Sequence, residues 1–347
     1  MKRYLLFVTL PYSYSILRPL QAEILRQGGE VAWFIEEECP NELTADEYQL
    51  KSVAEVLQFR PIACFAPGNY IPHFFPGVKV HLGHGYPINK RNYKEDTHFK
   101  MRGWFDMHCT QGPSSTSGFE RQAARYGFFR VYETGWCKAD TYFAPAMQQL
   151  PQNARPTILY STTFTQAVTS AALLADTIEE LVQRNEWDWI FMFHPKMDDP
   201  AVLERYGRIA RENPNATFLG NTFSFEALQR ADVMLCDRSS IMLEFMFLDK
   251  PVVAFRNTPT DVHLIHIAEP EEVKQGIRRA IERPEEVMER IRAYTLYHEP
   301  HRDCQCSKRV LAAVDHFIAE GHKGLKRKPL NWVRKLQMRR RFGYWRW

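Results

Sequence analysis

The 347-residue sequence has no run of about 18 apolar residues, the length that a membrane-spanning helix requires. Its N-terminal stretch MKRYLLFVTLPYS is basic and apolar, but no small-residue cleavage site follows, which favours a first strand over a signal peptide. The seven cysteines are odd in number and scattered, which favours a reducing compartment over a disulfide framework. Cys304 and Cys306 lack a second pair at a zinc-site spacing. We therefore expect a cytoplasmic protein without a structural metal site.

Common nucleotide-binding and catalytic motifs are also missing. No G-x-x-x-x-G-K-[ST], no G-x-G-x-x-G after the first predicted strand, no H-E-x-x-H and no G-x-S-x-G occurs. Kinase, simple dehydrogenase, zincin and serine-hydrolase interpretations therefore lack their motifs. An apolar content of 45% and a charged content of 25% are typical of a globular protein, and the length suits two domains.

Strand and helix patterns alternate along the chain with short connections, which predicts parallel sheets flanked by helices. Residues 83–119 are too broken and polar for a regular element, and residues 151–156 form a linker. We therefore expect two α/β domains, residues 1–150 and 151–322. Strands are predicted over 3–10, 30–37, 61–68, 78–85, 157–162, 187–195, 216–220, 232–237 and 251–255, and helices over 16–29, 43–59, 166–184, 200–212, 224–230 and 239–248.

The charge of the chain is uneven. Residues 323–347 contain ten Lys/Arg and no Asp/Glu, so the formal net charge of +4 divides into +10 for this segment and −6 for residues 1–322. Aromatic residues are interleaved with these charges. The mixture suits an anionic membrane surface, where each basic residue contributes roughly 1 kcal/mol and tryptophan favours the headgroup region. A solvated helix end is the alternative, while the acidic body and the lack of a recognition module argue against nucleic acid.

Polar residues gather where predicted strands end, and ligands of parallel sheets bind outside the carboxyl ends of the strands. In MLCDRSSIMLEF (234–245), Asp237, Arg238, Ser239 and Ser240 stand between a strand and a helix that carries Glu244. Hydroxyls, an arginine and unpaired helix amides suit a diphosphate, and the glutamate suits ribose hydroxyls. The alternative is an N-cap, in which Asp237 or Ser239 binds the helix's own amides.

Two other strand ends carry candidate residues. His194 and Lys196 end a strand where an imidazole and an ammonium suit a phosphate. Asp198 and Asp199 follow and leave Mg²⁺ open as a cofactor, but they are equally typical of the acidic start of a helix. Thr162 and Thr163 end the strand over 157–162.

His84 ends the fourth predicted strand, and glycine follows it. Histidine titrates near neutral pH and is a natural general base for a hydroxyl nucleophile. Gly85 lets a partner approach the backbone closely. Lys90 and Arg91 either meet an anionic acceptor or are solvated.

Together these stretches resemble the CDP-glycerol glycerophosphotransferase family, which includes enzymes that prime and polymerise teichoic acids. The resemblance covers most of the chain from about residue 80. Its most specific part is the Asp-x-Ser-Ser stretch followed by Lys-Pro-Val-Val, and ETGWCKAD departs from the family's glycine-proline-arginine turn. In order, it runs through GHG (83–85), ETGWCKAD (133–140), ILYSTTF (158–164), FHP (193–195), DVMLCDRSSIMLEFMFLDKPVVAF (232–255) and RDCQCSKRVLAAV (302–314).

The resemblance implies a GT-B-like architecture, with two Rossmann-like domains whose parallel sheets face each other across a cleft and a nucleotide held mainly by the C-terminal domain. It implies that His84 activates the acceptor hydroxyl, with Gly85, Lys90 and Arg91 on the acceptor side. It also implies a catalytic role for His194. The implied donor site comprises Thr162, Thr163, His194, Lys196, Asp237, Arg238, Ser239, Ser240 and Glu244.

The implied reaction transfers glycerol phosphate from CDP-glycerol to a hydroxyl of a cell-envelope glycan or lipid-linked acceptor and releases CMP. The short chain favours a single addition over polymerisation, and residues 323–347 would hold the enzyme on the inner face of the cell membrane. CDP-ribitol as donor, a GT-B glycosyltransferase using a CMP- or UDP-sugar, and a non-catalytic membrane-bound scaffold are the alternatives.

Overall fold

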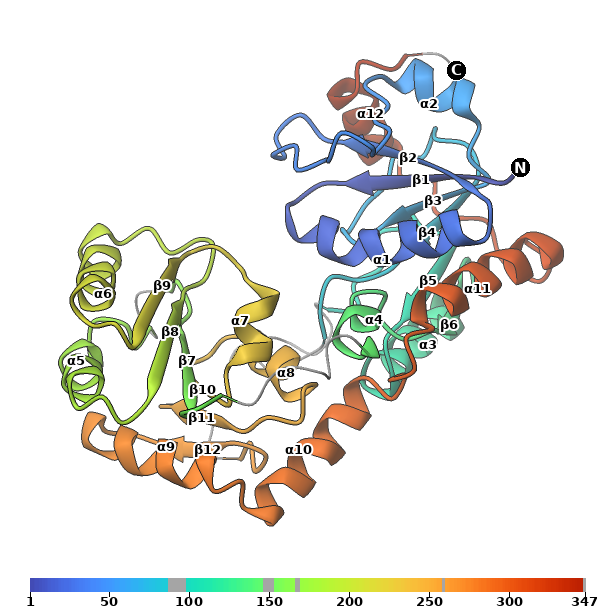
Figure 1. The fold of residues 1–347 in the computed structure, drawn as a ribbon. Helices are drawn as coiled ribbons and strands as arrows, with labels where there is room; N and C mark the ends of the chain where they lie inside the picture. The colour runs from blue at the N-terminus through green and yellow to red at the C-terminus, as the bar shows by residue number, and fades with distance from the viewer. Residues whose placement is uncertain (87–97, 146–152, 166–168, 258–259, 346–347) are drawn as a thin grey trace. The chain divides into compact units, whose positions relative to one another are not determined.

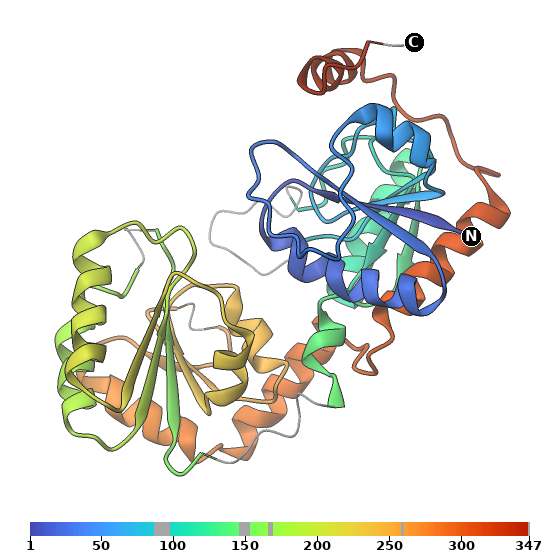
Figure 2. The ribbon, with the colours of Figure 1, turned by 45° about the horizontal axis from the view of Figure 1, so that its top comes forward.

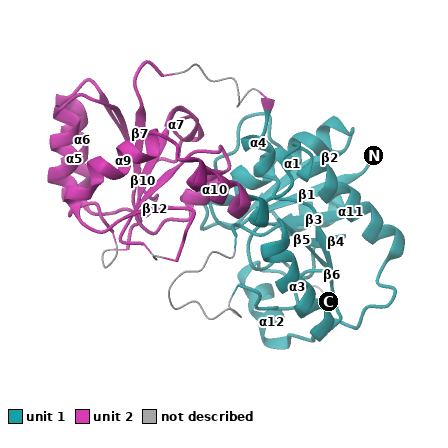
Figure 3. Cartoon of the chain, turned by 90° about the horizontal axis from the view of Figure 1, so that it is seen from below, with its two compact units in different colours: residues 1–144, 296–347 teal, residues 145–295 magenta. Residues whose placement is uncertain are grey.

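The computed structural model describes residues 1–86, 98–145, 153–165, 169–257 and 260–345 (Figure 1). The chain forms two compact units: unit 1 comprises residues 1–144 and 296–347, and unit 2 comprises residues 145–295 (Figure 3). Each unit contains a six-stranded sheet whose paired strands are parallel. The predicted α/β class with two Rossmann-like halves is confirmed.

The sheet of unit 1 has the strand order β2-β1-β3-β4-β5-β6. The order reverses between β1 and β3, because the chain runs outward to β2 and then returns beside β1. The strands are Arg3–Val8 (β1), Glu30–Ile35 (β2), Ala63–Ala66 (β3), Val78–His81 (β4), Met107–Thr110 (β5) and Arg130–Glu133 (β6). The helices are Tyr12–Arg26 (α1), Val53–Phe59 (α2), Pro113–Tyr126 (α3), Ala139–Tyr142 (α4), Cys306–Glu320 (α11) and Trp332–Arg341 (α12).

The sheet of unit 2 has the order β12-β11-β10-β7-β8-β9, with its reversal between β7 and β10. Its helices cover both faces of the sheet (Figure 2). The strands are Thr157–Ser161 (β7), Asp188–Met192 (β8), Ala216–Gly220 (β9), Val233–Cys236 (β10), Val252–Phe255 (β11) and Ile265–Ile267 (β12). The helices are Ala175–Gln183 (α5), Pro200–Glu212 (α6), Phe225–Arg230 (α7), Ile241–Met246 (α8) and Val273–Ile281 (α9), with a 3₁₀ turn at Pro270–Glu272. The helix Glu285–His298 (α10) begins in unit 2, and its last three residues are assigned to unit 1.

The return of the chain to unit 1 differs from the predicted domain boundaries. Residues 296–322, expected in the second domain, belong to unit 1, because α11 buries Val310, Val314 and Phe317 beside α1 and the sheet. Residues 323–347 were expected to form a separate tail, yet they also belong to unit 1. An extended segment leads from α11 to α12 (Figure 2), and Met338 of α12 is buried in the hydrophobic core beside β2 and β3.

Three predicted elements differ from the observed ones. The helix over 43–59 is present only as α2, because Ser52 caps it by accepting a hydrogen bond from the Glu55 amide. The helix over 166–184 is present as α5 alone among the described residues. Residues 83–119, expected to be irregular, contain β5 and the start of α3, since the short strand MHCT is buried although half of it is polar. Among the described residues, no helix is long and apolar enough to span a bilayer.

Candidate functional site

The His84 side chain lies at the strand-order reversal of the first sheet. Its Nδ1 is 3.1 Å from the carbonyl oxygen of Pro67, which follows β3. Its ring stacks on Tyr12, which follows β1, with ring centroids 5.0 Å apart and planes at 22°. Because a carbonyl can only accept, Nδ1 carries the proton of the neutral imidazole and Nε2 carries the lone pair. The sequence-predicted base is therefore exposed, oriented by two loops and in the tautomer that accepts a proton at Nε2.

The loop that carries His84 is fixed by Gln111, which follows β5. The Gln111 Nε2 donates a hydrogen bond to the Gly85 carbonyl oxygen at 3.0 Å. Gly83 has φ +70°, and a Cβ there would lie 2.8 Å from the same Nε2. Only glycine allows this backbone conformation and this close approach together. Gly83, the first glycine of GHG, therefore allows the His84 loop to pack against Gln111.

A buried carboxyl, Glu299, ties this loop to the end of β6. Its Oε2 accepts hydrogen bonds from the Tyr86 hydroxyl and from the Trp136 amide, both at 2.9 Å, and its Oε1 accepts one from the His301 amide at 3.3 Å. The side chain is fully buried, and this burial raises the pKa of Glu299 to about 8. Glu299 therefore connects the His84 loop, the turn after β6 and the segment that returns from α10.

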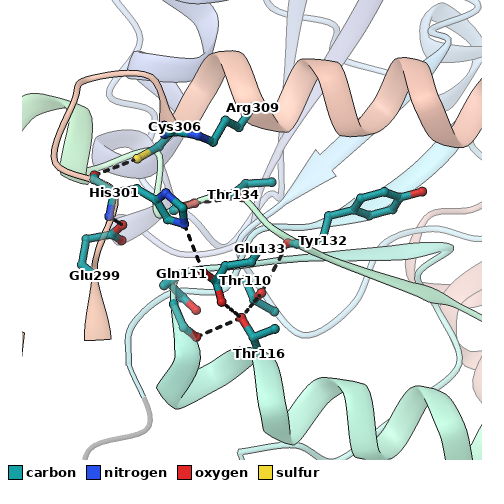
Figure 4. Close-up of polar contacts among 12 residues, drawn as sticks. Thr110, Gln111, Thr116, Tyr132, Glu133, Thr134, Glu299, His301, Cys306 and Arg309 are labelled. Atoms are coloured by element: carbon teal, nitrogen blue, oxygen red, sulfur yellow. Dashed lines mark hydrogen bonds and ion pairs between the residues drawn. The ribbon is translucent and has the colours of Figure 1, made fainter. Parts of the chain in front are cut away.

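A second carboxylate, Glu133, lies beside this connection at the end of β6 (Figure 4). Its Oε1 is 3.2 Å from Nε2 of His301, and its Oε2 accepts a 2.7 Å hydrogen bond from Thr116 of α3. Thr116 in turn lies 2.8 Å from the Thr110 hydroxyl at the end of β5. The carboxyl edge of β4, β5 and β6 thus carries a set of titratable and hydroxyl groups suited to binding a polar acceptor.

The ETGWCKAD stretch, which departs from the family pattern, joins the return segment to the sheet. Gly135 has φ +79°, and a Cβ there would lie 2.4 Å from the Cys306 sulfur. Asp140 accepts 2.8 Å hydrogen bonds from the amides of Cys306 and Ser307, and so caps the start of α11. Lys138 is buried with its ammonium 5.3 Å from the Trp136 ring centre. The role of this stretch in unit 1 is therefore structural.

In unit 2, the predicted donor residues follow three adjacent strands, β10, β7 and β8. Asp237 is buried, and its two oxygens accept from the amides of Thr163, Ser170 and Arg238 and from the Ser170 hydroxyl, at 2.7–3.0 Å. Burial raises the pKa of Asp237 against the effect of these hydrogen bonds. Its carboxylate holds the loops after β7 and β10 together at the strand-order reversal, rather than pointing to a ligand.

Ser239 and Ser240 differ from Asp237. α8 begins after Ser240 without a side-chain cap, and neither serine hydroxyl has a hydrogen-bond partner within the described parts of the chain. Arg238 is half-buried and donates to the Arg256 carbonyl oxygen at 3.2 Å. Glu244 lies one turn into α8 and is half-buried. Because α8 has only six residues, the hydroxyls and Arg238, rather than a helix dipole, are the groups that suit a phosphate here.

His194 is oriented by its own turn. The Lys196 amide donates to Nδ1 of His194 at 3.0 Å, so the neutral ring carries its proton on Nε2 and donates from there. The ring packs on Phe164, with ring centroids 4.5 Å apart, and the Lys196 ammonium lies 5.7 Å from the same aromatic ring. His194 has the opposite tautomer to His84. It therefore suits the donation of a hydrogen bond to a phosphate oxygen.

The remaining candidates have other positions. The Thr162 and Thr163 side chains are buried, and the Thr162 hydroxyl donates to the Thr163 carbonyl oxygen at 3.1 Å. Asp199 caps α6 by accepting from the amides of Ala201 and Val202, which is the helix-start interpretation. Lys90 and Arg91 lie outside the described residues. Within the described ranges, no group of three or more His, Cys, Asp or Glu residues is arranged to hold a metal ion.

Sequence reasoning missed most of the support around His84. Tyr12 begins α1, whereas Pro67 and Gln111 come from loops. None of them belongs to a recognisable motif, and only the fold brings them to the His84 loop. Glu299 and His301 gave a weak signal: the stretch HEPH places an acid between two histidines immediately before the region that resembles the family.

Comparison with known proteins identifies relatives of both units. The family model of CDP-glycerol:poly(glycerophosphate) glycerophosphotransferase matches residues 80–259, more than half of the chain. No curated protein matches the sequence. A variant of the wall teichoic acid polymerase TagF superposes with a TM-score of 0.65 at 13% identity, over 92% of this chain and 90% of that one. Another TagF crystal was soaked with CDPG.

Two structures that contain a nucleotide superpose on this chain with similar TM-scores. MnaA of S. aureus with UDP gives a TM-score of 0.63 at 14% identity, covering 95% of this chain and 99% of that one. The UDP-GlcNAc 2-epimerase of Neisseria meningitidis with UDP-GlcNAc gives 0.61 at 14% identity, covering 90% and 100%. At such identities these likenesses establish the GT-B-like fold.

Proposed function

We propose that this chain, which belongs to the CDP-glycerol:poly(glycerophosphate) glycerophosphotransferase family, transfers glycerol phosphate from CDP-glycerol to a hydroxyl of a cell-envelope glycan or lipid-linked acceptor. CMP is the other product. The family match supports the reaction class, and the CDPG soak of the similar polymerase supports the donor. The pathway that this reaction serves is teichoic acid synthesis.

In the proposed reaction, the acceptor oxygen attacks the β-phosphorus of CDP-glycerol. His84 Nε2 takes the hydroxyl proton, a new P–O bond forms, and the bond to the CMP oxygen breaks. His194, donating from Nε2, and Arg238 offset the charge of the diphosphate, and Ser239 and Ser240 donate hydroxyl hydrogen bonds to it. Thr162, Thr163 and Asp237 hold the loops that present these groups.

One observation carries this proposal: Nδ1 of His84 faces a carbonyl oxygen and Nδ1 of His194 faces an amide N–H, from which we infer opposite tautomers. A general base needs a ring nitrogen that accepts, and a phosphate-binding group needs one that donates. The Pro67 carbonyl sets the first state at His84, and the Lys196 amide sets the second at His194.

The test is CMP release by the purified protein, with a membrane or glycan extract as acceptor. CDP-glycerol, CDP-ribitol, CMP-sugars and UDP-sugars are offered in parallel. We expect the fastest release from CDP-glycerol and a loss of roughly 10²- to 10⁴-fold for His84→Ala. The exposed His266 of unit 2 provides a matched control, and His266→Ala should retain full turnover. Equal turnover by both variants would remove His84 as the base.

A second candidate function is transfer from a nucleotide sugar. It is favoured by the similarity to structures with UDP and UDP-GlcNAc, whose nucleotide is attached through a diphosphate as in CDP-glycerol. Release only from a UDP- or CMP-sugar would establish this alternative, and fastest release from CDP-ribitol would indicate a ribitolphosphotransferase. If the protein releases no nucleotide from any donor, a membrane-bound scaffold would be favoured.

We further propose that α12 attaches the protein to the inner face of the cell membrane. One side of α12 packs on unit 1, where Met338 is buried. The other side exposes 64% of Trp332, 70% of Val333 and 53% of Leu336 to solvent. Exposed arginines lie along the same helix. An apolar stripe flanked by cations is typical of helices that lie in an anionic membrane interface.

Co-sedimentation with vesicles tests this attachment. We expect binding to vesicles containing phosphatidylglycerol and little binding to phosphatidylcholine alone, with added salt weakening it. Trp332→Ser should weaken binding roughly tenfold or more, because the indole no longer enters the interface. Tyr48→Ser, at an exposed aromatic residue remote in sequence, is the control. Identical binding by the two variants would contradict the attachment through α12.

A further inference from the structure

Unit 1 contains a cavity at the edge of its sheet opposite to His84. Its volume is about 1080 Å³, slightly above the usual range of small-molecule sites. Lys2, Ile62, Val78 and Asp106, which line it, stand at or just before the starts of β1, β3, β4 and β5. The strands are parallel, so these residues mark the amino edge, whereas His84 follows the carboxyl edge. The end of α11 and Lys335 of α12 complete the walls.

The cavity has an excess of positive charge. Lys2 pairs with Asp315, and Lys328 pairs with Asp106, each at 2.6 Å. Two more lysines line the wall, Lys79 and Lys335, and neither has a carboxylate partner in the parts of the chain that the structure describes. With both acids paired, two positive charges are left for an anion to neutralise.

The pKa of His73 is lowered by its burial and by this positive charge. Burial, together with the nearby cations Arg339, Lys335 and Lys79, lowers the pKa of His73 to about 4. The ring is therefore neutral at physiological pH, and its buried Nδ1 has no hydrogen-bond partner among the described residues. Burial is the main cause of this low pKa, and the cations that add to it also attract an anionic ligand.

Apart from His322, whose Nε2 lies 3.2 Å from Asp106, much of the remaining lining is apolar. Trp104, Phe317 and Ile318 form this part, and Ile318 is 44% exposed although it lies at the end of a packed helix. A lining that combines lysines with aromatic and aliphatic side chains matches a molecule with a phosphate and an apolar chain. Free phosphate or glycerol phosphate would use only the cationic part.

We propose that this cavity is a second ligand site, which binds an anionic phospholipid with its phosphate at Lys79 and Lys335 and its apolar chain against Trp104, Phe317 and Ile318. The site lies at the amino edge of the sheet, away from the His84 loop, and does not depend on the transfer reaction. Lys335 belongs to α12, so a lipid in the cavity contacts the helix that also carries the exposed Trp332.

Isothermal titration calorimetry on the full chain tests the site. The probe is dihexanoyl-phosphatidylglycerol below its micelle concentration, compared with dihexanoyl-phosphatidylcholine, glycerol phosphate and inorganic phosphate. We expect saturable one-site binding of the anionic lipid and at least about tenfold weaker binding of the other three, since each lacks either the net charge or the chain.

Three variants locate the binding. Lys335→Gln should weaken it roughly tenfold by removing a charged contact. Lys51→Gln, which removes the same charge from an exposed position of unit 1 outside the cavity and outside α12, should leave it unchanged. Ile318→Glu places a carboxylate in the wall at a tolerant, exposed position and should abolish binding while thermal unfolding stays as in the parent. Equal binding of inorganic phosphate, equal binding of the zwitterionic lipid, or equal effects of Lys335→Gln and Lys51→Gln would each overturn the proposal.

Discussion

Glu299→Gln should change how the stability of unit 1 depends on pH. The pKa of Glu299 is about 8 in the folded protein against an ordinary value of 4.5, chiefly because of burial. Between pH 4.5 and 8 the folded state therefore binds more protons than the unfolded state, so stability falls as pH rises through this window. At 1.36 kcal/mol for each pH unit, the loss approaches about 5 kcal/mol above pH 8, an upper limit.

Glutamine keeps the shape of the protonated side chain and its capacity to accept hydrogen bonds from Tyr86 and Trp136, but it does not titrate. We therefore expect the variant to lack this decline and to become more stable than the parent above pH 8. Urea unfolding at pH 5, 6, 7, 8 and 9, followed by circular dichroism and tryptophan fluorescence, measures the difference.

Glu23→Gln is a control of opposite sign. A hydrogen bond from Arg26 lowers the pKa of Glu23, so its contribution to stability is present above pH 4.5 and is lost only as pH falls further. Its difference from the parent should be constant between pH 6 and 9. A constant difference for Glu299→Gln over the same range would refute the inference that Glu299 is protonated near neutral pH.

Three further variants test contacts in the two units. Gly83→Ala should lower kcat with little change in KM, because its Cβ displaces Gln111 and the His84 loop; an unchanged kcat in CMP release would show that the loop tolerates the shift. Lys250→Met should reduce the free energy of unfolding by about 2–4 kcal/mol in urea, since the ammonium donates to three carbonyls at the end of α7; a loss below about 0.5 kcal/mol would contradict this capping role. His194→Gln should retain more turnover than His194→Asn, because glutamine can place its amide donor near Nε2 and asparagine near Nδ1; the reverse order would mean that Nδ1 faces the donor.

The elements that were predicted correctly are those with strong local patterns. The helix over 200–212 is present over the same residues as α6, because Asp199 and Pro200 mark its start and an apolar stripe marks its face. Elements were missed where local pattern and burial disagree. β5 is the short run MHCT, and its His108 is buried against His81 and Phe119. Because two of its four residues are polar, the sequence did not indicate a buried strand.

Hydrophobic periodicity alone does not determine to which unit a helix belongs. α11 has an apolar face that any sheet of either unit could cover, and chain order alone assigns it to the second half. It belongs instead to unit 1, where Asp140 caps its start and Lys2 pairs with Asp315 near its end. Both contacts join residues more than 160 positions apart, and no local pattern encodes them.

The rule that ligands of parallel sheets bind at the carboxyl ends of the strands was more informative than any single motif. It predicted the positions of the candidate residues but not the role of each residue. It placed His84, His194 and the stretch from Asp237 to Ser240 correctly at carboxyl edges, because parallel sheets bring those ends together. At such an edge a polar side chain serves either a ligand or the loops. Asp237 accepts four hydrogen bonds from its own chain, whereas the serine hydroxyls two and three residues later have none among the described residues. A buried carboxylate with every oxygen occupied explains why an acid stands before the serines even without a ligand, and it leaves Arg238, Ser239 and Ser240 as the part of the motif that can act on the donor.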